Sequence, residues 1–277
     1  AKSNQKFLRA LRPWVVALES EPTFEGLGKH IPPILHTVLL IWKGSPYYNT
    51  TPRLVVLMRE LSNELIAKAS TFLTGDRLFE LMDNDEAGQA VEAIRTLLRV
   101  LGGFKAAFFD FKAKSAIEVP ENPWTAANNA CFHRLDKFLE RCHDVLDMAQ
   151  TMMQYKRLDG LEVGGTKGRS LSTSAMQIFS DFVHAVDKVR NLDYDIMDLS
   201  QKDFDVVWYE FRKDAKLLDQ RLAVVVVEGF KDCTTVMGSF KLFQSFEGLT
   251  ERPVLVQTLE ERYVEVVVLF AADLLIA

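Results

Sequence analysis

Apolar residues recur along most of this chain at the three- and four-residue spacing of one helix face. The clearest run follows Thr51-Pro52, where we interpret Thr51 as the N-cap and Pro52 as the first helical residue. Its apolar positions are Leu54, Leu57, Met58, Leu61, Leu65, Ala69 and Phe72. The pattern predicts a helix from residue 51 that Gly75-Asp76 ends.

The same spacing predicts a further helix after each interruption of the pattern. These expected helices cover residues 78–82, 83–108, 122–153, 172–191 and 200–237, with a last one after Pro253. Gly102-Gly103 is a candidate bend in the helix 83–108. Asn122 is the expected N-cap of the helix 122–153, and Ser172 or Thr173 that of the helix 172–191.

Strand-like alternation of polar and apolar residues is almost absent. Val224 to Val227 have high β propensity, but the helical pattern on both sides outweighs it. Four buried valines in a row would require a helix that packs on more than one side. The fold class is therefore predicted as all-α, with consecutive bundles of long helices. The interruption Pro120-Glu121-Asn122-Pro123 divides the chain into two expected bundles, residues 1–120 and 121–277.

Composition restricts the function classes. With 277 residues, 48% of them hydrophobic and 26% charged, the chain can bury a substantial core. A net charge of -5 argues against a dedicated nucleic-acid binder, and three cysteines fit a reducing compartment better than a disulfide framework. The chain begins at Ala1 without the apolar core of a signal peptide, and residues 264–277 are strongly apolar. We expect an internal fragment whose last helix is a core helix, too short to span a membrane.

The turn from Val163 to Ser170 resembles a phosphate-binding loop but lacks its details. A Walker A loop follows a buried strand and places Lys directly after the last Gly. Here Arg169 follows Gly168, Lys167 precedes it, and residues 129–156 before the turn have a helical pattern. We therefore expect a structural connector, with a nucleotide-dependent enzyme using residues 164–170 as the alternative.

Other candidate chemistry is weaker still. Cys131, His133, Cys142 and His143 are potential metal ligands, but the two cysteines lie eleven residues apart on one predicted helix. At about 1.5 Å per residue, that separation is roughly 16 Å, which no single zinc shell bridges. The carboxylates of residues 193–198 lack the Gly and Glu of a calcium loop, and no serine lies in a nucleophile elbow. No catalytic, cofactor or metal site is predicted.

Phenylalanine is crowded in one predicted helix. Phe104, Phe108, Phe109 and Phe111 lie within two turns, and Phe108 and Phe109 point to different faces. Both are buried only if neighbours surround the helix or if a partner covers one side. Either arrangement favours a structural or binding role.

Six longer strings carry a more specific resemblance. They are YYNTTPRLVVLMREL (47–61), NNACFHRLDKFLERCHDVLDM (128–148), LEVGGTKGRSLSTS (161–174), FRKDAKLLDQRLA (211–223), GFKDCTTV (229–236) and FKLFQSFEGLTERP (240–253). In sequence and order these strings resemble the N-terminal tail, or stem, of dynein heavy chains, and most closely axonemal outer-arm chains of the beta or gamma type. The resemblance covers nearly the whole chain and is weakest in the first forty residues.

This resemblance implies an elongated, rod-like tail of helical bundles with no catalytic residues. Its implied role is a scaffold that joins heavy chains, binds WD-repeat intermediate chains and light chains, and attaches the motor to the doublet microtubule, with docking-complex proteins as further partners. The parent protein would be a microtubule-dependent ATPase of the ciliary or flagellar axoneme, assembled in the cytoplasm, whose AAA+ ring lies outside this segment. The alternatives are a cytoplasmic dynein tail or a generic helical adaptor, although no period of 34 to 47 residues recurs.

Five residues are candidate contacts with protein partners. Tyr47, Tyr48 and Trp208 are chosen as exposed aromatic side chains, and Arg141 and Lys167 as charged rims. No nucleic acid, membrane or cofactor is among the expected partners.

Overall fold

The described part of the chain folds mainly into helices, in agreement with its helix-period patterning. The computed structural model describes residues 2–84, 86–118, 128–233, 235–249 and 252–276, and within these ranges it contains helices and no strands. The all-α fold class expected from the sequence is confirmed. Residue contacts divide the chain into two compact units: residues 1–81, 89–147 and 197–199 form unit 1, and residues 82–88, 148–196 and 200–277 form unit 2.

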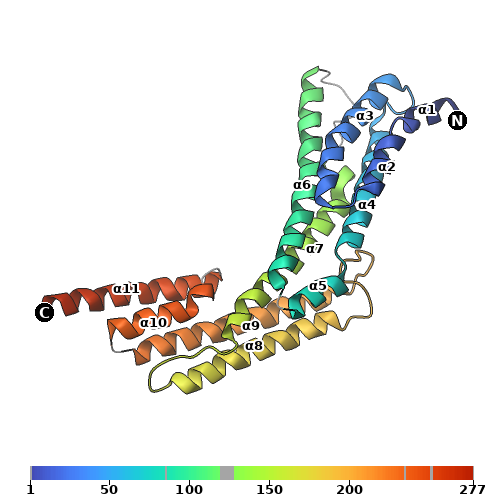
Figure 1. The fold of residues 1–277 in the computed structure, drawn as a ribbon. Helices are drawn as coiled ribbons and strands as arrows, with labels where there is room; N and C mark the ends of the chain where they lie inside the picture. The colour runs from blue at the N-terminus through green and yellow to red at the C-terminus, as the bar shows by residue number, and fades with distance from the viewer. Residues whose placement is uncertain (1, 85, 119–127, 234, 250–251, 277) are drawn as a thin grey trace. The chain divides into compact units, whose positions relative to one another are not determined.

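Unit 1 contains the helices of the N-terminal part of the chain (Figure 1). They are α1 (Lys2–Arg9), α2 (Arg12–Ser20), the 3-10 helix η1 (Glu25–His30), α3 (Ile31–Gly44), α4 (Thr51–Phe72), most of α5 (Gly75–Asp83), most of α6 (Ala87–Glu118) and α7 (Asn128–Tyr155) as far as Asp147. The ring of Phe132 on α7 lies 4.9 Å from that of Phe108 and 5.9 Å from that of Phe104, both on α6. These three buried rings join α6 to α7.

Unit 2 contains the end of α7 and the helices that follow it (Figure 1). They are η3 (Lys156–Leu158), α8 (Gly168–Arg190), α9 (Phe204–Asp232), α10 (Val236–Phe246), η4 (Glu247–Leu249) and α11 (Pro253–Ile276). α8 and α9 lie side by side, and α11 packs against α9 and α10. The fully buried rings of Tyr155 and Phe182 lie 5.1 Å apart and link α7 to α8.

Several helix ends differ from those expected. α4 begins at Thr51, so the N-cap is Thr50 and not Thr51. α8 begins at Gly168 with Lys167 at the N-cap position, so neither Ser172 nor Thr173 is the N-cap; the Ser172 hydroxyl instead accepts a hydrogen bond from the Val163 N–H at 2.9 Å. α9 ends at Asp232, and a separate helix, α10, follows it.

The valine run in α9 is helical, as expected, but it is not buried throughout. Val225 and Val226 are buried, whereas Val224 is 61% exposed. The expectation of four buried valines is wrong, because a 3.6-residue period turns some of four successive side chains away from one packing face.

The phenylalanine cluster of α6 is buried unequally. Phe108 is 1% exposed, while Phe109 is half-buried with its ring 6.0 Å from that of Phe132. α6 also continues through Gly102-Gly103 to Glu118.

The boundary expected at residue 120, with its N-cap Asn122, falls in residues 119–127 and lies outside the described residues. In the described part of the chain, no helix combines the length and the apolar character needed to cross a membrane.

Candidate partner-binding surfaces

The glycine loop, residues 163–168, is closed by a carboxylate of this same chain. Asp232, at the end of α9, accepts a hydrogen bond from the Lys167 N–H at 3.0 Å and another from the Thr166 hydroxyl at 2.7 Å. Gly165 has φ +95°, and a Cβ atom there would lie 2.5 Å from Asp232 Oδ2. Glycine is therefore required for the close approach of the loop to Asp232.

The charges around this loop already have partners. The Lys167 N–H and the Thr166 hydroxyl hold the pKa of Asp232 below its usual value. The Lys167 ammonium lies 3.2 Å from a carboxylate oxygen of Glu228, whose pKa is lowered by Lys231 and Lys167. The donors that would meet a phosphate thus hold two carboxylates, and no strand precedes the loop in the described residues. This geometry favours a structural connector over a nucleotide site.

The cysteines and histidines of α7 do not converge. Cys131 and Cys142 are buried, and His133 and His143 are exposed. Burial raises the pKa of the Cys142 thiol to about 12, which keeps it protonated. Among the described residues, no three His, Cys, Asp or Glu side chains are grouped so that they could hold a metal ion.

A polar cluster lies inside unit 2. The Arg252 guanidinium donates from Nε and a terminal nitrogen to the two carboxylate oxygens of Asp219, the second bond measuring 2.8 Å. Its other terminal nitrogen donates to Thr151 at 2.7 Å and to Gln154 at 3.4 Å. The Tyr155 hydroxyl also donates to Asp219. These contacts connect α7, α9 and the residue before α11, so the cluster supports the packing of three helices.

Tyr47 and Tyr48 lie in the connection between α3 and α4. Tyr47 is 41% exposed, as expected, and Tyr48 is half-buried. The two rings meet edge to face at 5.0 Å, and the Arg53 guanidinium lies 3.5 Å over the Tyr47 ring while donating to its backbone carbonyl. These contacts give an exposed aromatic and cationic surface that is held in one arrangement.

The other three candidate residues differ in exposure. Trp208 is 6% exposed and stacks on Phe211 at 4.7 Å, so the expectation that it is a surface residue is wrong. Arg141 is also 6% exposed and does not form a surface rim. Both lie at apolar-face positions of their helices, where packing covers even a large or charged side chain. Lys167 is exposed, with its ammonium engaged by Glu228.

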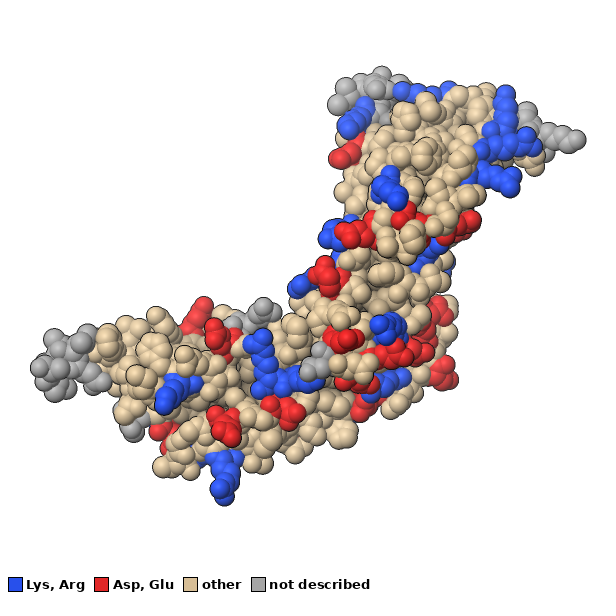
Figure 2. Space-filling view, viewed as in Figure 1, with Lys and Arg blue, Asp and Glu red and all other residues tan. Residues whose placement is uncertain are grey.

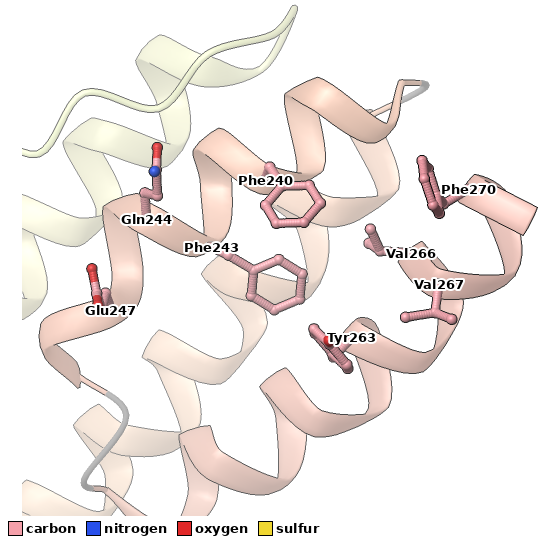
Figure 3. A pocket seen from close by; sticks show the side chains of 8 residues that line it. All are labelled: Phe240, Phe243, Gln244, Glu247, Tyr263, Val266, Val267 and Phe270. Carbon is pink, nitrogen blue, oxygen red and sulfur yellow. The ribbon is translucent and has the colours of Figure 1, made fainter. Parts of the chain in front are cut away.

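An apolar groove lies between α10 and α11. Its volume is about 660 Å³, and Figure 3 shows side chains of both helices that point toward the space between them. The lining residues are Phe240, Phe243, Gln244 and Glu247 with Tyr263, Val266, Val267 and Phe270. Phe240, Tyr263 and Phe270 are 54%, 59% and 51% exposed. The face of these helices seen in Figure 2 is mostly uncharged. Contiguous exposed apolar surface is unusual on a folded protein, so this groove is a candidate partner-binding surface.

Sequence reasoning found neither wall of this groove. The apolar run of residues 264–277 was expected to form a core helix, but Val267 and Phe270 in it are 48% and 51% exposed. The α10 wall was missed because the helix of α9 was expected to continue to Met237. The Thr235 hydroxyl, which accepts from the Gly238 N–H at 3.1 Å, is the N-cap signal that distinguishes α10.

Comparison with known proteins decides the family. The model of the family described as "Dynein heavy chain, N-terminal region 1" matches residues 1–276. This chain belongs to the dynein heavy chain family. It is 42% identical to the dynein beta chain of the flagellar outer arm from Chlamydomonas reinhardtii, in a match of 274 residues that covers 99% of this chain. It is 33% identical over 95% of its length to the ciliary dynein beta chain of Heliocidaris crassispina, and 27% identical over 99% to dynein axonemal heavy chain 11 of Sus scrofa.

The dynein match also locates this chain within its relatives. The chain spans about 6% of the length of these three heavy chains. Because the match is to the N-terminal region, these residues correspond to the tail and not to the AAA+ motor. The resemblance noted in six strings of the sequence is therefore confirmed across the chain.

Proposed function

We propose that this chain is a non-catalytic segment of an axonemal dynein heavy-chain tail that serves as a helical scaffold for other dynein subunits. The family match over residues 1–276, with relatives named for flagellar and ciliary dyneins, is the observation that carries the proposal. The parent polypeptide would be a microtubule-dependent ATPase of the cilium or flagellum. This segment would contribute attachment and not hydrolysis.

The internal packing suits a scaffold that bears load. Long helices packed along their length must break many contacts together before they separate. The Arg252–Asp219 ion pair and the ring contact of Tyr155 with Phe182 lie inside unit 2 and resist such separation. A tail segment with these contacts can transmit force without unfolding.

Two exposed surfaces are available for partners. One is the patch formed by Tyr47, Tyr48 and Arg53, which combines aromatic rings with a guanidinium, the residue types enriched at binding hot spots. The other is the groove between α10 and α11. The proposed partners are other dynein heavy chains, WD-repeat intermediate chains, light chains and docking-complex proteins. A cytoplasmic dynein tail or a generic helical adaptor is the alternative assignment.

A pull-down from a ciliary extract tests the scaffold role. The immobilised chain should recover dynein heavy, intermediate or light chains, identified by mass spectrometry. The double variant Tyr47→Ala/Tyr48→Ala tests the aromatic patch, with Tyr209→Ala as the matched control because Tyr209 is 67% exposed on α9.

We expect the double variant to lose subunits that the control retains, with helicity by circular dichroism unchanged. A folded chain that recovers no dynein subunit would contradict the scaffold role and leave this segment as a spacer. Equal recovery by the double variant and the control would remove the tyrosine patch from the binding surface.

A further inference from the structure

We infer that a cationic pocket between α4 and α7, within unit 1, binds an anionic group, a carboxylate or a phosphate, that a partner protein carries. This inference rests on the proposed scaffold function and deepens it by naming the chemistry that one partner presents. It depends on two arginine side chains that are anchored beside the pocket and have no acidic partner. The pocket shares no residue with the tyrosine patch or with the groove between α10 and α11.

The pocket lies near the start of α7 and has a volume of about 320 Å³. Its lining combines two guanidiniums and an imidazole with neutral polar side chains. The lining residues are Arg59, Ser62 and Asn63 of α4 with Cys131, His133 and Arg134 of α7. No carboxylate is among the lining residues that the structure describes. The space therefore suits a small anionic group together with part of the side chain that carries it.

Each arginine is anchored to the opposite helix by one hydrogen bond. On α4, Arg59 Nε donates to the carbonyl oxygen of Ala130 on α7 at 2.6 Å. On α7, Arg134 Nη1 donates to Asn63 Oδ1 on α4 at 3.3 Å. A guanidinium has five N–H donors in a fixed fork, so one bond to each leaves most of its donors for a ligand. The two bonds thus hold both guanidiniums beside the pocket with donors to spare.

Neither guanidinium has an acidic partner. Arg59 and Arg134 are exposed, and within the described part of the chain neither forms an ion pair. Burial raises the pKa of the Cys131 thiol, and the positive charges of Lys112 and Arg59 oppose that rise. The charge of Arg59 therefore acts on the buried floor of the pocket. Charge-assisted hydrogen bonds from two such guanidiniums would hold a carboxylate or phosphate firmly.

The carboxylates nearest in sequence do not neutralise this charge. Glu60 and Glu64 on α4 each follow a lining residue by one position, which is about 100° around the helix. On α7, Asp136 pairs with Lys105 of α6 at 2.5 Å. None of these three carboxylates lines the pocket. The lining itself therefore favours an anionic occupant and would repel a cationic one.

A protein that carries the anion fits this site better than a nucleic acid or an acidic membrane does. The whole chain has a net charge of -5, and binding to a polyanionic surface requires a broad excess of lysine and arginine. A small pocket with two anchored guanidiniums instead recognises individual anionic groups. Clusters of arginine bind phosphorylated and acidic peptide motifs in this way.

Titration of the full chain with three peptides tests the inference. The peptides share one alanine–glycine sequence of about ten residues and differ only at the central residue, which is serine, glutamate or phosphoserine. NMR spectra of the arginine Nε–H groups and of the backbone amides follow binding, since their shifts report even weak association. The pocket variants are Arg59→Gln and Arg134→Gln. The matched control is Arg95→Gln, because Arg95 is an exposed arginine of α6 that does not line the pocket.

We expect the phosphoserine and glutamate peptides to bind at least about tenfold more tightly than the serine peptide. Each pocket variant should weaken their binding by about tenfold or more, and Arg95→Gln by less than about twofold. Tighter binding of the phosphoserine peptide than of the glutamate peptide would assign a phosphorylated partner, and equal or weaker binding an acidic one. Arg134→Gln gives an independent result if circular dichroism shows that Arg59→Gln has lost helicity.

Three results would overturn the inference. They are equal binding of the serine peptide and the two anionic peptides, equal binding by the pocket variants and the Arg95→Gln chain, and no shift of the pocket signals with either anionic peptide. Binding of a DNA oligonucleotide or of acidic vesicles through both arginines, without peptide binding, would overturn the assignment to a protein partner. If the pull-down still recovers dynein subunits in any of these cases, the scaffold function stands and only the pocket assignment fails.

Discussion

Replacing Arg252 by methionine should destabilise unit 2 strongly, because it leaves the buried carboxylate of Asp219 without its cationic partner. The two side chains are each only 11% exposed, and the guanidinium meets both carboxylate oxygens. Methionine fills much of the space of the arginine stem without its charge. The substitution therefore tests the ion pair more than it tests packing.

The expected cost follows from the burial of the pair. Removing one member of a buried ion pair typically costs about 3–5 kcal/mol, because the remaining charge is left in a poorly solvating environment. Asp219 keeps the hydrogen bond from the Tyr155 hydroxyl, so we expect a value near about 3 kcal/mol. The double variant Arg252→Met/Asp219→Leu should cost less than Arg252→Met alone, since no unpaired charge remains.

An exposed ion pair that also includes a residue of α9, the helix of Asp219, provides the control. Arg221 on α9 pairs with Asp181 on α8 at 2.5 Å, and their side chains are 45% and 33% exposed. Arg221→Met should cost less than about 1 kcal/mol, because solvent screens exposed pairs. Urea unfolding followed by circular dichroism gives the free energies, and hydrogen exchange of α9 amides assigns the loss to unit 2.

Two results would refute this reasoning. In the first, Arg252→Met costs no more than Arg221→Met, which would mean that solvent reaches Asp219 in solution. In the second, the double variant is as unstable as the sum of the single variants. That additivity would show that Arg252 and Asp219 are not coupled.

Three further results are expected from the described contacts. Phe182→Ala should cost about 3–5 kcal/mol in urea unfolding because the ring is fully buried, whereas Val206→Ala, at a position 67% exposed, should cost less than about 0.5 kcal/mol. The fold lowers the pKa of Asp232. The hydrogen bonds that Asp232 accepts from the glycine loop therefore stabilise the loop fully above pH 3.8, the ordinary pKa of the group, and this stabilisation is lost as pH falls through the lower pKa of the folded chain. Asp232 stays ionised between about pH 5 and 8, so its titration should not change the hydrogen-exchange rate of the loop amides in that range. Asp232→Asn should raise this rate throughout the same range. An unchanged rate in the variant would contradict the role of Asp232. A thiol reagent at about pH 8 should modify half-buried Cys233 and spare Cys142, whose pKa is raised to about 12, until urea is added; labelling of Cys142 in the folded chain would count against its burial.

The pattern of apolar residues was sufficient to predict where most helices lie. The run from Leu54 to Phe72 repeats at helical spacing, and α4 covers it. That spacing depends only on the helix period, so it is readable without tertiary information. The strings that resemble dynein tails likewise identified the family, because long matches in one order do not arise from helix periodicity alone.

The exposure of particular side chains could not be predicted in the same way. Trp208 and Tyr209 are neighbours in the sequence, yet the first is buried and the second is 67% exposed. Which of them is covered depends on the face of α9 that packs against its neighbours. Arg141 shows the same limit, because its charge predicted exposure while its position on α7 places it among packed side chains.

By itself, the sequence determined the all-α class, the position of most helices and the dynein family, since these follow from local periodicity and from strings of residues. Only the tertiary structure decided that Asp232 closes the glycine loop and that Arg252 meets Asp219, pairs separated by 65 and 33 residues. It also decided that α10 and α11 form a groove. Such contacts depend on how distant segments pack, and a one-dimensional pattern carries no record of which helix faces meet.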